Sequence, residues 1–176
     1  MRGLTLLMLI FIFSTASFAQ NEKYQKILRD SREAKTEFIK SDSLMASLFK
    51  DAPAYVIFPN VGKGGIGIGG AAGNGIFFEN GEPTGTAAMK QVSIGFQFGG
   101  QAYREVIFFQ NQEAIDRFKD NNFEFSAQAS AVAVDKGASA NVNYRDGVMV
   151  FTQKKGGLMY EASIGGQQFT FEPLGE

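Results

Sequence analysis

The spacing of hydrophobic positions changes at Pro53, from a helical period before it to a period of two after it. From Asn21 to Lys40 the apolar residues recur every three or four positions, and charged residues cover the other side. Asn21 is a suitable N-cap for this helix. A second, shorter apolar stripe follows and ends at Asp51 and Pro53. The pattern therefore predicts two helices at the N-terminal side of the fold.

After Pro53, short alternating or continuous apolar runs are separated by Gly, Asn or Asp. Such runs are typical of β-strands, and they include AYVIF, NGIFFE, VSIGFQF, YREVIFF, GVMVFTQ and QQFTFE. Residues 111–121 return to the helical period, with Asn111 placed as an N-cap. We therefore predict an α+β fold: a curled antiparallel β-sheet, barrel-like or a sandwich, covered by the N-terminal helices and by one short helix near 111–121.

The first nineteen residues have the pattern of a secretory signal peptide. Arg2 gives a positive start, Leu4–Phe13 is apolar, and Ser17-Phe18-Ala19 resembles a cleavage signal. The apolar run is shorter than the ~20 residues of a transmembrane helix. The alternatives are an uncleaved anchor or a buried helix. We expect cleavage near Ala19, export to the periplasm or the medium, and a single mature domain over residues 20–176.

Composition excludes several classes of function. The chain of 176 residues has no cysteine and no histidine, and without Arg2 it holds 16 basic residues against 18 acidic ones. That balance does not suit a general nucleic-acid binder. The commonest general base, metal ligand and best nucleophile are also missing. The acids Glu113, Asp116 and Asp120 have the spacing of a solvated helix face. We therefore predict no catalytic residues, no metal, no cofactor and no enzyme.

The stretch PNVGKGGIGIGGAAGNGIFF, residues 59–78, raises the question of a phosphate loop. A Walker loop needs Ser or Thr after its lysine, because that hydroxyl binds magnesium. Here Lys63 is followed by Gly64, and a strand pattern rather than a helix comes next. Glycine within a strand allows a ligand or another backbone to approach closely. The sequence therefore favours a glycine-rich strand over a nucleotide site, with either an acyl chain or the protein's own helix against it.

The segment AYVIFPNVGKGGIGIGGAAGNGIFF resembles the opening motif of the SYLF lipid-binding domain family. Further similarity follows in the family's order: VSIGFQFGGQAYREVIFFQNQEAIDRF, FEFSAQASAVAV and KKGGLMYEASIGGQQF. Together these blocks cover roughly Leu48 to Phe169. The family is known for phospholipid binding, its eukaryotic members bind phosphoinositides, and fungal members regulate actin. The resemblance implies a non-catalytic protein of the exported bacterial branch that binds anionic phospholipid or a membrane surface.

Lysines beside glycines are the candidate headgroup contacts, because clustered lysines attract anionic lipid and exposed glycine N–H groups can receive phosphate oxygens. The alternative for each lysine is an ordinary solvated turn. A structural or protein-interaction module of the envelope, with an envelope protein as partner, is the alternative function. The candidates are Lys63, Gly64, Gly65, Lys154 and Lys155, with Lys90, Arg104, Lys136 and Arg145 as weaker ones.

Overall fold

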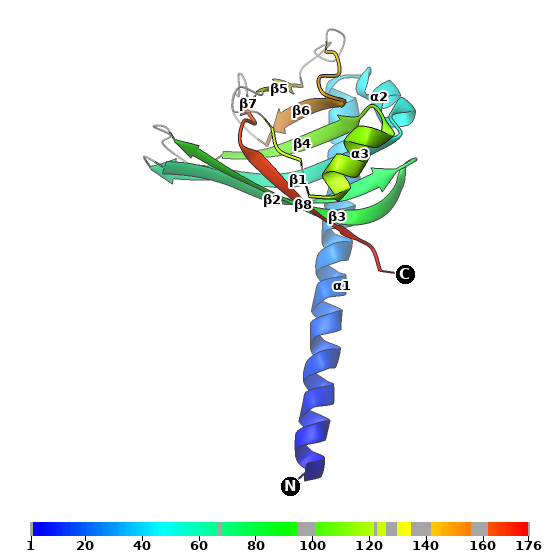
Figure 1. Ribbon diagram of the computed structural model, residues 1–176, viewed down its shortest axis with the longest axis vertical. Coiled ribbons are helices and arrows are strands. Elements are labelled where there is room, and N and C mark those ends of the chain that lie inside the picture. Colours follow the sequence, from blue (N-terminus) through cyan, green and yellow to red (C-terminus); the bar gives the residue numbers. More distant parts are fainter. Residues whose placement is uncertain are drawn as a thin grey trace.

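The computed structural model describes residues 2–66, 68–94, 101–121, 123–125, 130–134, 142–155 and 162–175 of the chain. These residues form the predicted α+β fold (Figure 1). The helices are α1 (Arg2–Ser41), α2 (Met45–Asp51) and α3 (Gln112–Lys119). The strands are β1 (Ala54–Ile66), β2 (Ile68–Glu79), β3 (Glu82–Ile94), β4 (Gln101–Phe109), β5 (Ser130–Ala133), β6 (Val148–Lys154), β7 (Ala162–Ser163) and β8 (Gln167–Pro173).

The strands form one sheet in the order β7-β5-β6-β4-β1-β2-β3-β8. All neighbours are antiparallel except β5 and β6, which run parallel, so the sheet is mixed rather than purely antiparallel. The first and last strands in this order, β7 and β8, are consecutive in the chain and are separated only by residues 164–166. The sheet therefore curls until its two edge strands, β7 and β8, come near each other. Among the described residues these two strands do not pair, so the sheet is not a closed barrel.

A short segment borders β8 on its free side. Phe125 N donates to Gln167 O at 3.3 Å, and Gly166 N donates to Phe125 O at 3.1 Å. Glu124 forms an isolated antiparallel bridge with Gln168. This pairing occupies backbone groups that an open sheet edge would otherwise expose.

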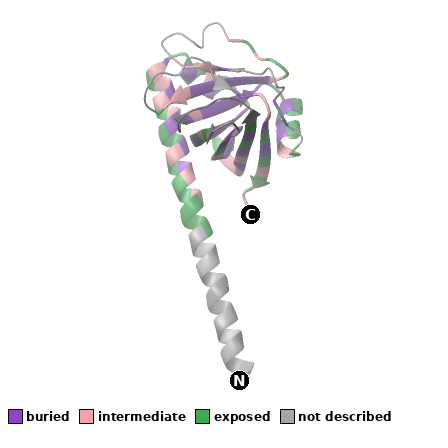
Figure 2. Cartoon of the chain, turned by 90° about the vertical axis from the view of Figure 1, so that its left-hand side faces the viewer, coloured by how far each residue is buried: buried purple, intermediate pink, exposed green. Residues whose placement is uncertain are grey.

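Buried hydrophobic residues lie on both faces of the sheet, and Figure 2 shows how much of the sheet is buried. We call the face that packs on α3 the inner face and the face that packs on α1 and α2 the outer face. The inner face includes Val56, Phe58, Phe77, Met89, Ile107, Phe109 and Phe169. The outer face includes Tyr55, Ile57, Ile76, Phe78, Val106, Phe108 and Phe151. Two buried faces explain why the strands are more continuously apolar than a one-sided sheet requires.

Aromatic rings fill the inner core. Phe118 of α3 stacks on Phe77 with ring centroids 5.4 Å apart, and it lies 5.2 Å from the ring of Phe109. Across the curl, Phe58 of β1 and Phe169 of β8 are 5.7 Å apart. Each buried phenylalanine contributes about 1.5–3 kcal/mol. These rings hold α3 and both halves of the curl together.

The short helix begins as the sequence predicts. Asn111 has extended backbone (φ −150°), and its Oδ1 accepts a hydrogen bond from Ala114 N at 3.0 Å. This satisfies one of the amides that a helix start leaves without an intrahelical partner. The predicted position and cap of α3 are confirmed.

The long N-terminal helix differs from the prediction in its start. α1 runs without a break from Arg2 to Ser41, so Asn21 lies inside it and is not its N-cap. Among residues 20–41 of this helix, Leu28 is the first buried one, and Ala34 and Phe38 pack with it on the outer face of the sheet. Figure 1 shows the N-terminal end extending away from the sheet. Within the described part of the chain, no helix is long and apolar enough to cross a membrane.

Candidate membrane-binding site

The glycine-rich stretch forms most of the hairpin of β1 and β2. Lys63 pairs with Ala71, Gly64 with Gly70 and Gly65 with Gly69. On its other side, β1 pairs with β4 only as far as Lys63 and Gln101. The end of the hairpin therefore extends beyond β4, as Figure 1 shows.

The glycines of this stretch serve two different purposes. A Cβ at Gly73 would lie 3.0 Å from Asn60 O, and one at Gly75 would lie 2.8 Å from the ring of Phe58. These glycines are needed because β1 bulges between Ile57 and Asn60, so the two strands approach closely. At Gly62 and Gly64, by contrast, nothing lies within 4 Å of an added Cβ. Close packing by the protein's own strand explains the first pair, whereas the second pair is open.

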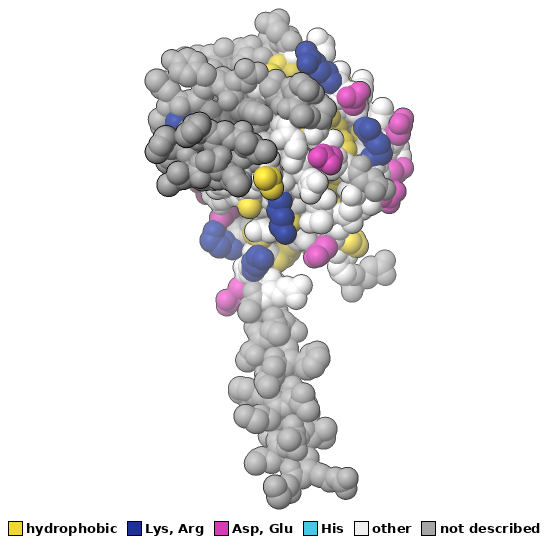
Figure 3. Space-filling view, turned by 60° about the vertical axis from the view of Figure 1, so that its left-hand side comes forward, with side chains coloured by type: hydrophobic (Ala, Val, Ile, Leu, Met, Phe, Trp, Pro, Cys, Tyr) yellow, Lys and Arg dark blue, Asp and Glu magenta, His cyan; other side chains and the backbone are white. Residues whose placement is uncertain are grey.

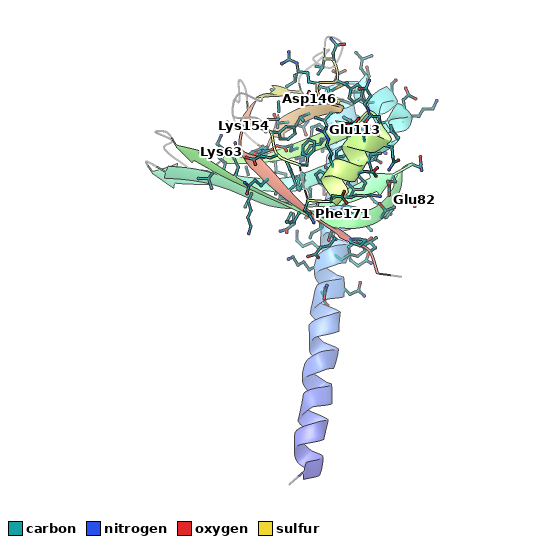
Figure 4. The ribbon with its side chains drawn as sticks, in the orientation of Figure 1. Lys63, Glu82, Glu113, Asp146, Lys154 and Phe171 are labelled. Atoms are coloured by element: carbon teal, nitrogen blue, oxygen red, sulfur yellow. The ribbon has the colours of Figure 1, made fainter. Side chains whose placement is uncertain are left out.

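Two of the candidate lysines lie on the same face of the sheet. Tyr103 of β4 pairs with Val61 of β1 on one side and with Lys154 of β6 on the other. Lys63 lies two residues after Val61 on β1. Side chains alternate between faces along a strand, so Lys63 and Lys154 both lie on the inner face with Tyr103. They flank β4 from either side, with backbones on the order of 10 Å apart. Both are half-buried, and Figure 4 shows them at the same end of the sheet.

Lys155 lies on the opposite face. Its N donates to Ala102 O at 3.0 Å, and its Nζ donates to Asn60 Oδ1. Asn60 Nδ2 in turn donates to Asp30 of α1 at 3.3 Å. Partial burial, followed by the charge of Arg104, lowers the pKa of Lys155. The predicted pair Lys154-Lys155 is therefore divided between the two faces of the sheet.

The two glycines of the predicted site are divided in the same way. Gly64 is exposed and lies two residues from Gly62, on the face of Asn60. Gly65 lies one residue further along β1 and therefore falls on the face of Lys63. The five predicted residues thus form two groups, of which Lys63, Gly65 and Lys154 share the inner face.

The weaker candidates do not join this group. Arg104 is half-buried and donates to Gln153 Oε1 at 3.1 Å, and Gln153 Nε2 donates to the carbonyl oxygen of Glu37 in α1 at 3.2 Å. Arg104 therefore orients Gln153, and Gln153 in turn binds α1 to the sheet. Lys90 is exposed on the outer side of β3. Arg145 lies before β6, and Lys154 ends that strand, so they are at opposite ends. Lys136 lies outside the described residues.

The charges of the described surface are mixed. On the face shown in Figure 3, lysine and arginine side chains are interspersed with aspartate and glutamate. A binding site for anionic headgroups on such a surface has to be local, because no broad positive field covers that described face. Among the described residues, no group of three or more His, Cys, Asp or Glu side chains is placed to hold a metal ion.

Sequence reasoning missed a buried polar cluster on the inner face, beside the two lysines. Glu105 of β4 has no exposed surface, and Gln167 Nε2 donates to its Oε2 at 3.0 Å. Burial raises the pKa of Glu105 to about 7, against the hydrogen bond from Gln167, which lowers it. Burial, and then the charge of Glu105, also raises the pKa of Tyr103. The signal was the alternation of YREVIFF, which places Glu105 among inward residues.

Comparison with known proteins identifies the family. Residues 90–173 match the family described as "Ysc84: Las17-binding protein actin regulator". The SYLF domain is the other name of this domain. Residues 90–173, just under half of the chain, are therefore similar to the Ysc84 (SYLF) family. The resemblance seen in the sequence is confirmed there. The first resembling block, residues 54–78, lies outside the matched range.

One curated relative has a different name from the family. "Beta cell expansion factor A" of Aeromonas veronii is 26% identical over 83 residues, which is 46% of this chain and 32% of that protein. The chain thus spans about a third of the length of that relative. The match to the Ysc84 family contains Lys154, Glu105 and Gln167, whereas Lys63 lies before it. The Ysc84 family is a family of binding domains associated with membranes or actin regulation, not a family of catalysts.

Proposed function

We propose that the protein is a non-catalytic protein of the cell envelope that binds membrane surfaces and favours anionic phospholipid headgroups. The observation that carries the proposal is the position of Lys63 and Lys154 on one face of the sheet, flanking the start of β4. A signal peptide over residues 1–19, cleaved near Ala19, would deliver the chain to the periplasm or the medium.

Simple electrostatics supports such a site. A lysine near an anionic membrane surface contributes about 1 kcal/mol to binding. Two lysines on one face therefore give roughly a 30-fold preference for anionic over neutral vesicles. The binding is expected to weaken with salt, because exposed charges are screened.

The test is co-sedimentation of the mature chain with vesicles of phosphatidylglycerol and phosphatidylcholine, compared with phosphatidylcholine alone, at low and high salt. The double variant Lys63→Ala Lys154→Ala should weaken anionic binding roughly 30-fold. Lys50→Ala is the matched control, since Lys50 is exposed on α2, away from β4. Lys155→Ala is expected to leave the binding unchanged, since Lys155 lies on the other face beside α1.

Two results would contradict the proposal at different levels. Equal binding by the double variant and the wild type would show that the lipid site lies elsewhere. Absence of binding to either kind of vesicle would reject the membrane function and favour a protein-interaction module of the envelope.

A further inference from the structure

The inner-face polar cluster contains oxygen atoms that have no hydrogen-bond partner. Glu105 Oε1, Thr152 Oγ1 and Gln167 Oε1 are all buried without one. None of the three side chains has exposed surface. A buried polar atom without a partner destabilises the folded state, and more so when it is charged. The cluster is therefore incomplete as the protein alone forms it.

The three side chains come from three strands, and Thr152 and Gln167 both neighbour Glu105. Glu105 of β4 and Thr152 of β6 are direct cross-strand partners, so their Cβ atoms are about 5 Å apart on one face. Gln167 of β8 reaches the same carboxylate from the opposite side, through the 3.0 Å bond from its Nε2 to Glu105 Oε2. The free oxygen of Gln167, Oε1, belongs to the same side-chain amide as the Nε2 that donates to Glu105.

The chemistry of the free atoms defines what would complete the cluster. The carboxylate and amide oxygens can only accept hydrogen bonds, and a threonine hydroxyl can accept as well. An ionised Glu105 also needs a positive charge. Burial and the hydrogen bond from Gln167 are the influences that act on the pKa of Glu105, and no described lysine or arginine is among them. The ring of Phe58, which pairs with Glu105 across β1 and β4, adds a face that attracts cations.

We propose that Glu105, Thr152 and Gln167 form a binding site for a primary ammonium group, whose three N–H donors match the three free oxygens. A divalent metal suits the cluster less well, because calcium takes six to eight oxygen ligands and magnesium demands an octahedron. The amine belongs either to a small free molecule or to an aminophospholipid headgroup. This site is separate from the proposed contact of Lys63 and Lys154 with anionic headgroups, and either can fail without the other.

Other charged and titratable groups near the site are few on the described elements. On the inner face, Tyr103 of β4 lies beside the cluster, close enough to Glu105 and Gln167 for both to act on its pKa. Lys154 of β6 and Lys63 of β1 lie further along, towards the end of the sheet where β4 begins. From β8 the site receives Gln167, and the segment 123–125 contributes Phe123 and Phe125, with Glu124 exposed. Binding requires the ionised carboxylate, so it should strengthen as pH rises through about 7.

The test is thermal denaturation of the full chain at pH 8 with methylammonium chloride, and with tetramethylammonium chloride at equal ionic strength. Tetramethylammonium carries the charge but no N–H donor. Above its dissociation constant, methylammonium should raise Tm by roughly 3–5 °C for each tenfold increase in concentration. Tetramethylammonium should not, and the rise with methylammonium should shrink at pH 5.5.

Variants locate the effect. Glu105→Gln keeps the shape of the side chain and should abolish the increase in Tm with methylammonium. Glu124→Gln removes the same charge from an exposed position and should leave that increase unchanged. Thr152→Val keeps the carboxylate and should reduce the rise. Vesicles of phosphatidylethanolamine with phosphatidylcholine, compared with phosphatidylcholine alone, separate the sources. An extra rise identifies a lipid amine, and its absence identifies a free one.

Three outcomes would overturn the proposal. One is an equal rise with tetramethylammonium, which would show that charge alone acts. Another is an undiminished rise in Glu105→Gln. The third is stabilisation by calcium chloride but not by methylammonium, which would mean that the three oxygens bind a metal.

Discussion

Gly75 of β2 lies against Ile57 of β1 so closely that a methyl group at position 75 would collide with the Ile57 carbonyl oxygen. The contact follows from the bulge in β1 between Ile57 and Asn60. It separates the glycines of the hairpin into those that the fold requires and those that it does not.

The first prediction concerns this separation. Gly75→Ala should lower the free energy of unfolding by about 1–3 kcal/mol, because the added methyl overpacks the strand pair. Gly64→Ala meets open space and should raise it by about 0.4–1 kcal/mol, through loss of freedom in the unfolded chain. Urea denaturation of both variants measures the difference. Similar losses of stability in both would show that the hairpin end is packed as tightly as its base.

The second prediction is a dependence of stability on pH that Glu105 controls. Its pKa is about 7 in the folded protein and about 4.3 in an unfolded chain. The folded state therefore holds a proton that the unfolded state has released between these values, so stability falls as pH rises from about 4.3 to about 7 and is constant above. The loss is on the order of 3 kcal/mol.

Glu105→Gln removes this titration. At pH 8 the variant should be more stable than the wild type by roughly that amount, and at pH 4 the two should be nearly equal. Denaturation curves at both pH values provide the measurement. If the free energies of unfolding of wild type and variant differed by the same amount at pH 4 and at pH 8, the pKa of Glu105 would not be raised in the folded protein.

The third prediction concerns the start of α3. Asn111→Ala removes the oxygen that caps Ala114 N and should cost about 1 kcal/mol, or about 2–4 °C in Tm. Asn111→Asp keeps an acceptor at the positive end of the helix and should retain most of the stability. Equal losses in the two variants would assign the effect to something other than the cap.

The fourth prediction separates the two halves of α1. A chain that begins at Gln20 should fold with nearly unchanged stability, because it keeps Leu28, Ala34 and Phe38, the residues of α1 that pack on the sheet in the part whose burial is described. A chain that begins at Ser43 lacks both Leu28 and Phe38 and exposes the outer face of the sheet. It should be less stable, because the burial of each of these side chains contributes about 1.5–3 kcal/mol. Circular dichroism and urea denaturation compare the two chains.

Mass spectrometry of the protein expressed in cells with its first nineteen residues tests the proposed cleavage, with Gln20 expected as the first residue. A chain starting at Gln20 that is much less stable than the full chain would show that residues 1–19 belong to the fold.

The elements of the fold could be predicted where the cause is local. Asn111 and the apolar face of residues 112–119 lie within one short segment, and so do the periods that mark α1 and the strands. The parallel pairing of β5 with β6 could not be predicted, because it depends on where a distant strand is placed. The continuation of α1 through Asn21 to Arg2 was missed because Asn21 resembled a cap.

The candidate site shows the same limit. That Lys63 and Lys154 share a face depends on the register of β1, β4 and β6, which a single sequence does not contain. The separation of Lys154 from Lys155 follows from the alternation of side chains once β6 is known to end at Lys154. Glu105 was visible in the alternation of its strand, but its partner Gln167 is 62 residues away.

The order of strands in the sheet also governs when the molecule can complete its fold. β8 is made almost last, yet it pairs with β3, supplies Phe169 to the core and carries Gln167 to Glu105. During synthesis β3 therefore keeps one unpaired edge until residues 167–173 have been made, so the contacts that close the curl form after those of the other described strands.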